Sequence, residues 1–214
     1  MSNVVSPARR SVPGLARHAA RAVLAGGFAL VPALAFAHPG HGPAVGFAHG
    51  FLHPVSGLDH VLAMVAVGIF AAQLGGRAIW AVPASFVALM AAGGFLGMSG
   101  IGLPLVELGI ALSIIVLGGT VALGRKDWPL GAAMALVGFF ALFHGHAHGA
   151  EMPVDASGLE YAAGFMAATA ALHAAGIGLA LSIGKLSEAR APRLAQAVGA
   201  VVAVAGLGIL SGAI

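Results

Sequence analysis

The chain of 214 residues is 59% hydrophobic and 8% charged, whereas a soluble domain usually carries about 25% charged residues. This composition excludes an ordinary water-soluble globular protein and predicts an all-α, polytopic membrane protein. The formal net charge of +3 does not indicate nucleic-acid binding, because four of the ten Lys and Arg residues lie in the first 21 residues. The remainder carries six basic and seven acidic residues and forms no basic patch. The absence of cysteine excludes disulfide bonds and thiolate metal ligands.

The amino terminus is typical of a secretory signal peptide over residues 1–37, with a basic region, an apolar stretch and an Ala-Phe-Ala cleavage motif ending at Ala37. Cleavage would leave a periplasmic, histidine-rich segment at 38–46. Its new terminal amine, together with His38 and His41, could capture a divalent cation. The alternatives are an uncleaved first helix and a solvated tail whose two histidines bind nothing.

Six apolar segments follow, each near the roughly 20 residues that a membrane-spanning helix requires. They predict a six-helix transmembrane domain over 47–214, with spans at about 47–74, 79–98, 101–123, 129–148, 158–184 and 194–213. Only Ser99 and Gly100 separate the second and third segments, which predicts a tight hairpin. The long first and fifth segments could be tilted, or broken near His53-Pro54 and Gly176.

The distribution of basic residues predicts the orientation of these spans. Beyond the signal peptide, every Lys and Arg falls in the connections after the first, third and fifth segments, and the other connections have none. Short cytoplasmic loops carry an excess of Lys and Arg. The sequence therefore predicts that both ends of the mature chain lie on the outer side of the membrane.

The first segment opens with a cluster of ionisable residues, His49, His53, Asp59 and His60. At about 100° per residue, the three histidines would fall within about 40° of one another on one continuous helix, with Met64 beside them. Ionisable side chains inside a bilayer are costly and usually functional. We interpret Met64 as a packing residue, and the alternative is that its thioether sulfur binds the metal.

The fourth segment ends with a matching cluster. His144, His148 and Glu151 stand at i, i+4 and i+7 and share a helix face. His146 points elsewhere, where it could join His38 and His41 in capturing the ion at the outer face or simply face water. In the predicted topology this cluster reaches the same outer half of the membrane as the first one. His173, about midway along the fifth segment, is either a further ligand or a packing histidine.

Imidazole nitrogens combined with a few carboxylate oxygens suit first-row metals such as Ni, Co, Zn, Cu and Fe. The two clusters therefore predict a metal site between the first and fourth segments. Each carboxylate could bind the ion or orient a neighbouring histidine. The four glycines nearby would allow close helix contact or local unwinding: Gly50, Gly57, Gly145 and Gly149. Glu107, in the outer part of the third segment, is either a partly solvated interfacial acid or a functional residue.

Two motifs resemble the HupE/UreJ family of nickel and cobalt permeases: His53-Pro54-x-x-Gly57-x-Asp59-His60 followed by Leu62-Ala63-Met64, and Phe143-His144-Gly145-x-x-His148-Gly149-x-Glu151. A looser match is Glu160-Tyr161-x-x-Gly164-Phe165. The resemblance implies uptake of Ni²⁺ or Co²⁺ as cargo across the bacterial inner membrane, with no permanently bound cofactor, to supply hydrogenase or urease. It also implies the transport residues, which are His53, Asp59, His60, His144, His148 and Glu151.

The same residues leave two other functions open: an intramembrane metal-dependent enzyme, and a haem-binding bundle with paired histidine ligands. The chain has no His-Glu-x-x-His motif and no soluble domain for a substrate, so we predict a transporter and not an enzyme. The expected partners are a divalent metal ion and the lipid bilayer. Assembly into a homo-oligomer is left open.

Overall fold

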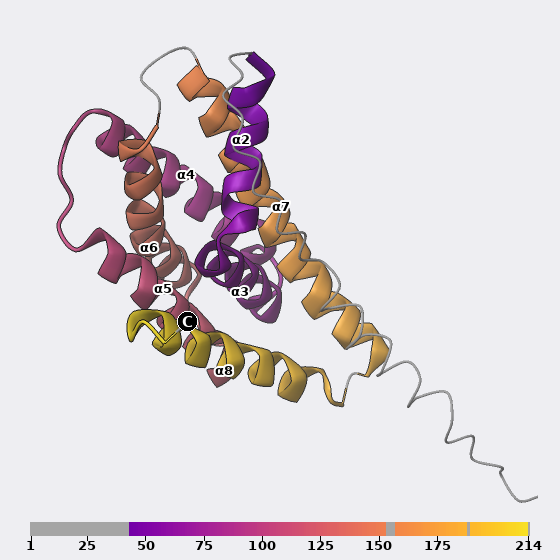
Figure 1. Ribbon diagram of the computed structural model, residues 1–214. Helices are drawn as coiled ribbons and strands as arrows, with labels where there is room; N and C mark the ends of the chain where they lie inside the picture. The colour runs from indigo at the N-terminus through magenta and orange to yellow at the C-terminus, as the bar shows by residue number, and fades with distance from the viewer. Residues whose placement is uncertain (1–42, 153–156, 188, 214) are drawn as a thin grey trace, which may run out of the picture. The chain divides into compact units, whose positions relative to one another are not determined.

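The structure is a computed structural model that describes residues 43–152, 157–187 and 189–213. The predicted signal peptide, His38 and His41 lie outside these described residues. Within them, all secondary structure is helical (Figure 1). The helices are α2 (Pro43–Ser56), α3 (Leu58–Leu74), α4 (Ala78–Met98), α5 (Val106–Leu123), α6 (Leu130–Ala150), α7 (Ser157–Leu186) and α8 (Ala191–Leu210).

Five of these helices, α4 to α8, are long and apolar enough to cross a membrane. The pair α2 and α3 passes the same test of length and composition only together, as a pair bent by 81°. The prediction of a polytopic helical membrane protein is therefore confirmed, with five spans, or six if the bent pair counts as one. The fifth predicted segment is the unbroken 30-residue helix α7, so the break considered near Gly176 does not occur.

The first predicted span is not one continuous helix. Helix α2 ends at Ser56 and α3 begins at Leu58, with Gly57 in an extended conformation between them. Pro54 lies in the last turn of α2, where it offers no amide proton to the helix. The break considered near His53-Pro54 therefore occurs, at Gly57. The prediction that His49, His53 and His60 form a stripe on one helix is wrong, because the helix axis turns before His60.

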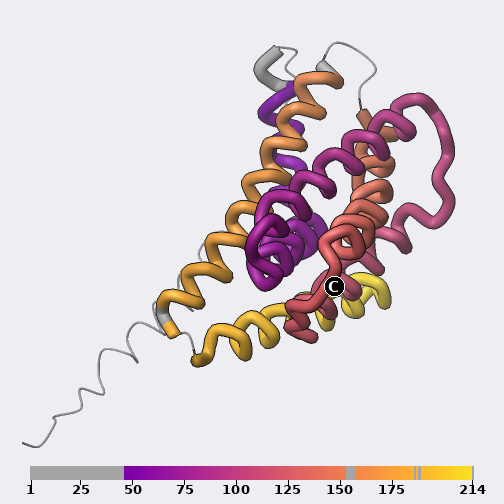
Figure 2. The backbone as a smooth tube through the Cα atoms, turned by 180° about the vertical axis from the view of Figure 1, so that it is seen from behind, coloured from indigo at the N-terminus to yellow at the C-terminus, as the bar shows by residue number. Residues whose placement is uncertain are grey.

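The connection between α4 and α5 is also longer than predicted. Residues 99–105 separate the two helices, so the expected tight hairpin at Ser99-Gly100 is wrong and the helix expected from 101 begins at Val106. Gly100 has a φ of 71° and Leu105 a φ of 59°, and neither value is helical. Pro104 further disfavours helix in the residue before it. Figure 2 shows this connection as an open loop.

Close backbone contacts hold the helices that carry the histidines. A Cβ atom on Gly145 or Gly149 of α6 would overlap a carbonyl oxygen of α4, and one on Gly50 of α2 would overlap the Tyr161 carbonyl of α7. These contacts confirm that the glycines beside the histidines allow close helix approach. Helices α2 and α7 lie side by side in both views (Figures 1 and 2). Met64 is fully buried in the apolar core, which supports its interpretation as a packing residue.

Candidate metal-binding site

Three histidines from three helices converge beside the α2–α3 break. His53 lies in the last turn of α2, His60 in the first turn of α3 and His148 in the last turn of α6. The ring centroid of His148 is 4.6 Å from that of His53 and 4.6 Å from that of His60. The bend therefore does not disperse the predicted cluster, since it leaves both histidines beside the same residue of α6.

Glu151 completes a possible set of metal ligands. One nitrogen each of His53 and His148 and one carboxylate oxygen of Glu151 all lie within 4.8 Å of one another. Two ligands of one ion, with bonds of about 2.1 Å, lie at most about 4.2 Å apart. Small side-chain rotations would therefore bring all three groups onto a single ion. Glu151 directly follows α6 and is exposed to the outside of the protein.

His60 is held by a carboxylate on one side and faces His148 on the other. Its Nδ1 lies 3.0 Å from Asp59 Oδ1, and its Nε2 lies 2.7 Å from His148 Nε2. An ionised carboxylate can only accept a hydrogen bond, so the Nδ1–H group of His60 donates to it. The Nε2 lone pair of His60 then faces His148. Of the two roles left open for Asp59, the structure therefore has it orienting a histidine, an arrangement common around metal sites.

His144 lies next to His60 but is completely buried. Its exposed fraction is 0%, and its ring centroid is 4.9 Å from that of His60. The Nε2 atom lies 2.9 Å from Ser113 Oγ of α5, while Nδ1 has no hydrogen-bond partner within the described residues. The sequence did not single out Ser113, because one serine in an apolar helix carries no signal of its own.

One cavity of about 240 Å³ is lined by His53, Asp59, His60, His148 and Glu151, together with Glu107 from the first turn of α5. No Lys or Arg lines this cavity, but three carboxylates do: Asp59, Glu107 and Glu151. A cleft lined by charges of one sign concentrates ions of the opposite sign. Sequence reasoning left Glu107 open between an interfacial and a functional acid and did not count it among the ligands. The signal that could have included it was an acidic residue at the outer end of an otherwise apolar helix.

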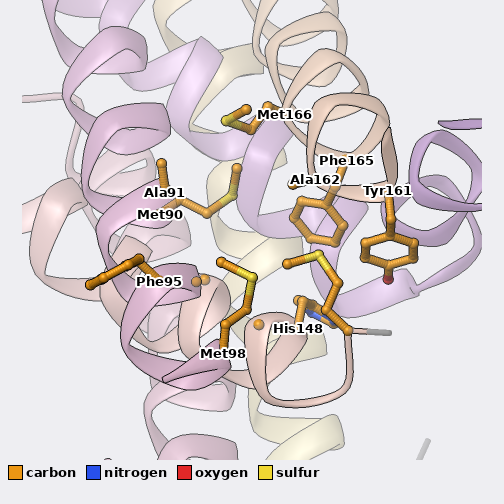
Figure 3. A pocket seen from close by; sticks show the side chains of 13 residues that line it. Met90, Ala91, Phe95, Met98, His148, Tyr161, Ala162, Phe165 and Met166 are labelled. Carbon is orange, nitrogen blue, oxygen red and sulfur yellow. The ribbon is translucent and has the colours of Figure 1, made fainter. Parts of the chain in front are cut away.

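On its other side His148 borders an apolar cleft of about 100 Å³. Figure 3 shows His148 there beneath Phe165 and close to Met98. The ring of Phe165, on α7, lies 4.7 Å from that of His148. Most side chains on this side offer water no hydrogen bonds, whereas the other cavity presents histidines and carboxylates.

Three other predicted residues do not join the cluster. His49 is exposed, and its nearest aromatic partner is Tyr161, 5.9 Å away between centroids. His146 is buried, and its Nε2–H donates to the Ile101 carbonyl oxygen at 2.7 Å. His173 is 1% exposed, packs edge-on against Phe86 and has no hydrogen-bond partner for either nitrogen within the described residues.

Comparison with known proteins agrees with the resemblance seen in the motifs. The sequence model of the family described as HupE / UreJ protein matches residues 26–209. The chain is also 50% identical over 184 residues to Protein HupE from Rhizobium leguminosarum bv. viciae, an alignment that covers 85% of this chain and 93% of the relative. No solved structure matches the chain. The chain therefore belongs to the HupE/UreJ family.

Proposed function

We propose that this protein is a secondary transporter that takes up Ni²⁺ or Co²⁺ across the bacterial inner membrane through the cavity between α2, α3, α5 and α6. The observation that carries the proposal is the pairing of His60 and His148, whose Nε2 atoms come within 2.7 Å of each other beside His53 and Glu151. Family membership supports a transport role and not an enzymatic one. The nickel would serve hydrogenase or urease, as the resemblance implies.

The helix break supports cation passage at this place. Ser56 and Gly57 line the same cavity as the histidines, and irregular backbone at membrane depth is tolerated where it lines a cavity. The carbonyl groups at the end of α2 carry the partial negative charge of a helix C-terminus, which favours a cation. Transporters often bind their ions at such discontinuous helices.

The positions of the basic residues support an outward-facing site. A second cavity of about 140 Å³ brings together the ends of α3, α5 and α7 and the start of α8, and Gln73 and Lys126 line it. All six basic residues of the described chain are on or next to these helix ends: Arg77, Arg125, Lys126, Lys185, Arg190 and Arg193. The histidine cavity lies at the opposite ends of α3 and α5. By the positive-inside rule, we propose that the histidines face the outside, together with both ends of the mature chain.

The steps of uptake follow from these groups. The carboxylates draw a hydrated ion into the cavity, where His53, His148 and Glu151 replace part of its water. The ion then binds between the Nε2 atoms of His60 and His148, and the proton that His148 held on Nε2 moves to Nδ1 of the same ring, which has no hydrogen-bond partner within the described residues. From there the ion moves inward past His144. An inward potential of 100 mV lowers the free energy of a divalent ion by about 4.6 kcal/mol, which is enough to drive accumulation without a nucleotide.

Uptake of radioactive Ni²⁺ by cells tests the proposal. Cells making the wild-type protein should accumulate more nickel than cells with an empty vector, and His60→Ala and His148→Ala should remove the difference. His146→Gln is the matched control, because it alters a buried histidine of the same helix while keeping an amide that can reach Ile101. We expect it to stay within about twofold of wild type, with protein in the membrane quantified for every variant.

Each outcome has a separate meaning. Wild-type accumulation no higher than that of the empty vector would overturn the transport function. Normal uptake by both alanine variants would keep the function and remove the proposed site. Equal loss in His146→Gln would mean that any change near the end of α6 disturbs the protein, and that His60 and His148 have no special role.

A further inference from the structure

We infer that Ser113 is a positioning residue, which holds His144 in the form that keeps its Nδ1 lone pair free for the passing ion. The contact itself follows from the hydrogen bonds of the described residues. Its consequence for transport rests on the proposed function. Nothing in the composition or motifs of the sequence assigns a role to Ser113, which lies in the middle of the apolar helix α5.

The direction of the hydrogen bonds fixes the role of the Ser113 hydroxyl. A serine hydroxyl has a single proton to donate. The Oγ atom lies 2.6 Å from the carbonyl oxygen of Ile110, and two oxygens approach so closely only when a proton lies between them. The hydroxyl therefore donates to Ile110. It accepts at its other contact, from His144 Nε2, 2.9 Å away.

This arrangement determines the tautomer of His144. A ring that donates through Nε2–H and is neutral has its lone pair on Nδ1. That atom is buried and has no partner within the described residues, although buried polar atoms are usually hydrogen-bonded. An unsatisfied acceptor of this kind costs about 1–3 kcal/mol. A cation passing from His60, whose ring lies 4.9 Å away, would satisfy it.

The Ser113–His144 contact parallels the one between Asp59 and His60. In each pair a neighbouring oxygen accepts the N–H group of the imidazole, so the other nitrogen remains free for a ligand. Asp59 does this with Nδ1 of His60, and Ser113 with Nε2 of His144. The difference is that Ser113 is neutral and fully buried, which suits a position that the ion must leave again.

The simpler explanation is that Ser113 only bonds to its own helix, as serines in apolar helices often do. Ser85 in α4 makes the same bond three residues back, to the Val82 carbonyl at 2.8 Å, and it is also buried. Ser85 has no hydrogen bond to a histidine within the described chain, and its other contact is a long one of 3.5 Å to a backbone carbonyl. Ser85 is therefore the matched control for Ser113.

A direct test is nitrogen-15 NMR of purified, metal-free protein labelled in its histidine rings. The His144 signals are identified by their loss in His144→Gln. We expect wild-type His144 to carry its proton on Nε2, in a slowly exchanging hydrogen bond. Ser113→Ala should shift this proton signal and speed its exchange, whereas Ser113→Thr and Ser85→Ala should keep it. A proton on Nδ1 in the wild type, or an unchanged signal in Ser113→Ala, would overturn the inference.

A second test measures Ni²⁺ affinity by calorimetry. Removing a hydrogen-bond partner of a metal-binding histidine typically weakens metal binding 10- to 100-fold. Ser113→Ala should therefore raise the Kd about tenfold or more, while Ser113→Thr and Ser85→Ala stay within about twofold. In a His144→Gln background, Ser113→Ala should have no additional effect on the Kd, because Ser113 acts on the ion only through His144. Additive effects would overturn the positioning role.

The two tests separate this inference from the proposed function. A wild-type protein that binds and transports no nickel would overturn the transport function, and the NMR comparison would still decide whether Ser113 sets the tautomer of His144. The opposite result would be normal nickel uptake together with a His144 proton signal that does not change in Ser113→Ala. Transport would stand, and the role of Ser113 would be rejected.

Discussion

Replacing Gly57 with alanine tests whether the contact between Asp59 and His60 sets up the site. The backbone at Gly57 has φ −88° and ψ 119°, which alanine adopts without strain. The added Cβ atom would lie 2.7 Å from Asp59 Oδ1 and 3.1 Å from His60 Nδ1. The substitution therefore intrudes on the two atoms that form the contact, while it leaves both side chains chemically intact.

The geometry gives the size of the effect. Ordinary contact begins near 3.4 Å, so the carboxylate must retreat by about 0.7 Å. The distance from Asp59 Oδ1 to His60 Nδ1 is already 3.0 Å. A retreat of that size would lengthen it beyond the hydrogen-bonding range of about 2.7–3.2 Å. Losing such a partner should weaken nickel binding about 10- to 100-fold, or by about 1.4–2.7 kcal/mol.

Protein stability should change little in the same variant. The Asp59 side chain is 32% exposed and can rotate toward the cavity without disturbing the core. Calorimetric Kd for Ni²⁺, the KM of uptake and the midpoint of thermal unfolding together separate a site effect from a folding effect. Gly119→Ala in α5 is the control, because its Cβ would meet nothing within 4 Å. Wild-type affinity in Gly57→Ala would refute the orienting role of Asp59.

Two further predictions concern the helices that carry the site. Gly145→Ala would drive a Cβ atom into a carbonyl oxygen of α4, so it should cost about 1–3 kcal/mol of stability and reduce nickel uptake. Gly131→Ala, on the same helix but with open space around it, should do neither, as thermal unfolding and uptake will show. His53→Ala should strongly reduce uptake because His53 belongs to the ligand set. His49→Ala, one turn earlier and exposed, should stay within about twofold of wild type, and equal losses would contradict this distinction.

Much of the helical arrangement could be predicted because hydrophobic length is a local property of the sequence. The fourth segment, expected at 129–148, is helix from Leu130 to Ala150, and the fifth, expected at 158–184, is helix from Ser157 to Leu186. The pairing of the first and fourth segments also followed from local information. Alternate spans run in opposite directions, so the start of one and the end of the other fall at the same end of the bundle.

The parts that were predicted wrongly depend on a change in the direction of a helix axis or on contacts between helices. A periodicity of 100° per residue assumes one straight axis, and the break at Gly57 removes that assumption. The hydrogen bond of His146 depends on the loop at 99–105, whose path no helical pattern specifies. Ser113 gains its significance only from a residue on another helix, 31 positions away. Sequence patterns therefore identified which residues are unusual, but only the fold distinguishes those that meet from those that do not.

The spacing of His60 and His148 also predicts which ions compete with nickel. If an ion binds both Nε2 atoms at about 2.05 Å without moving either ring, their separation of 2.7 Å corresponds to an N–metal–N angle of about 82°. This is close to the 90° of the square-planar and octahedral geometries that Ni²⁺ adopts. A tetrahedral site, which Zn²⁺ prefers, would need nitrogens about 3.3 Å apart, and the packed rings would have to separate by about 0.6 Å.

Displacement of radioactive Ni²⁺ from purified protein measures this preference. Unlabelled Ni²⁺ and Co²⁺ should compete at similar concentrations, and Zn²⁺ should need about tenfold more, since a strained angle weakens both of its bonds to nitrogen. Mg²⁺, which prefers oxygen ligands, is the control and should not compete. If Zn²⁺ displaced nickel as readily as nickel itself, the two rings would have to open on binding. The ion-free spacing of His60 and His148 would then have no part in selecting the metal.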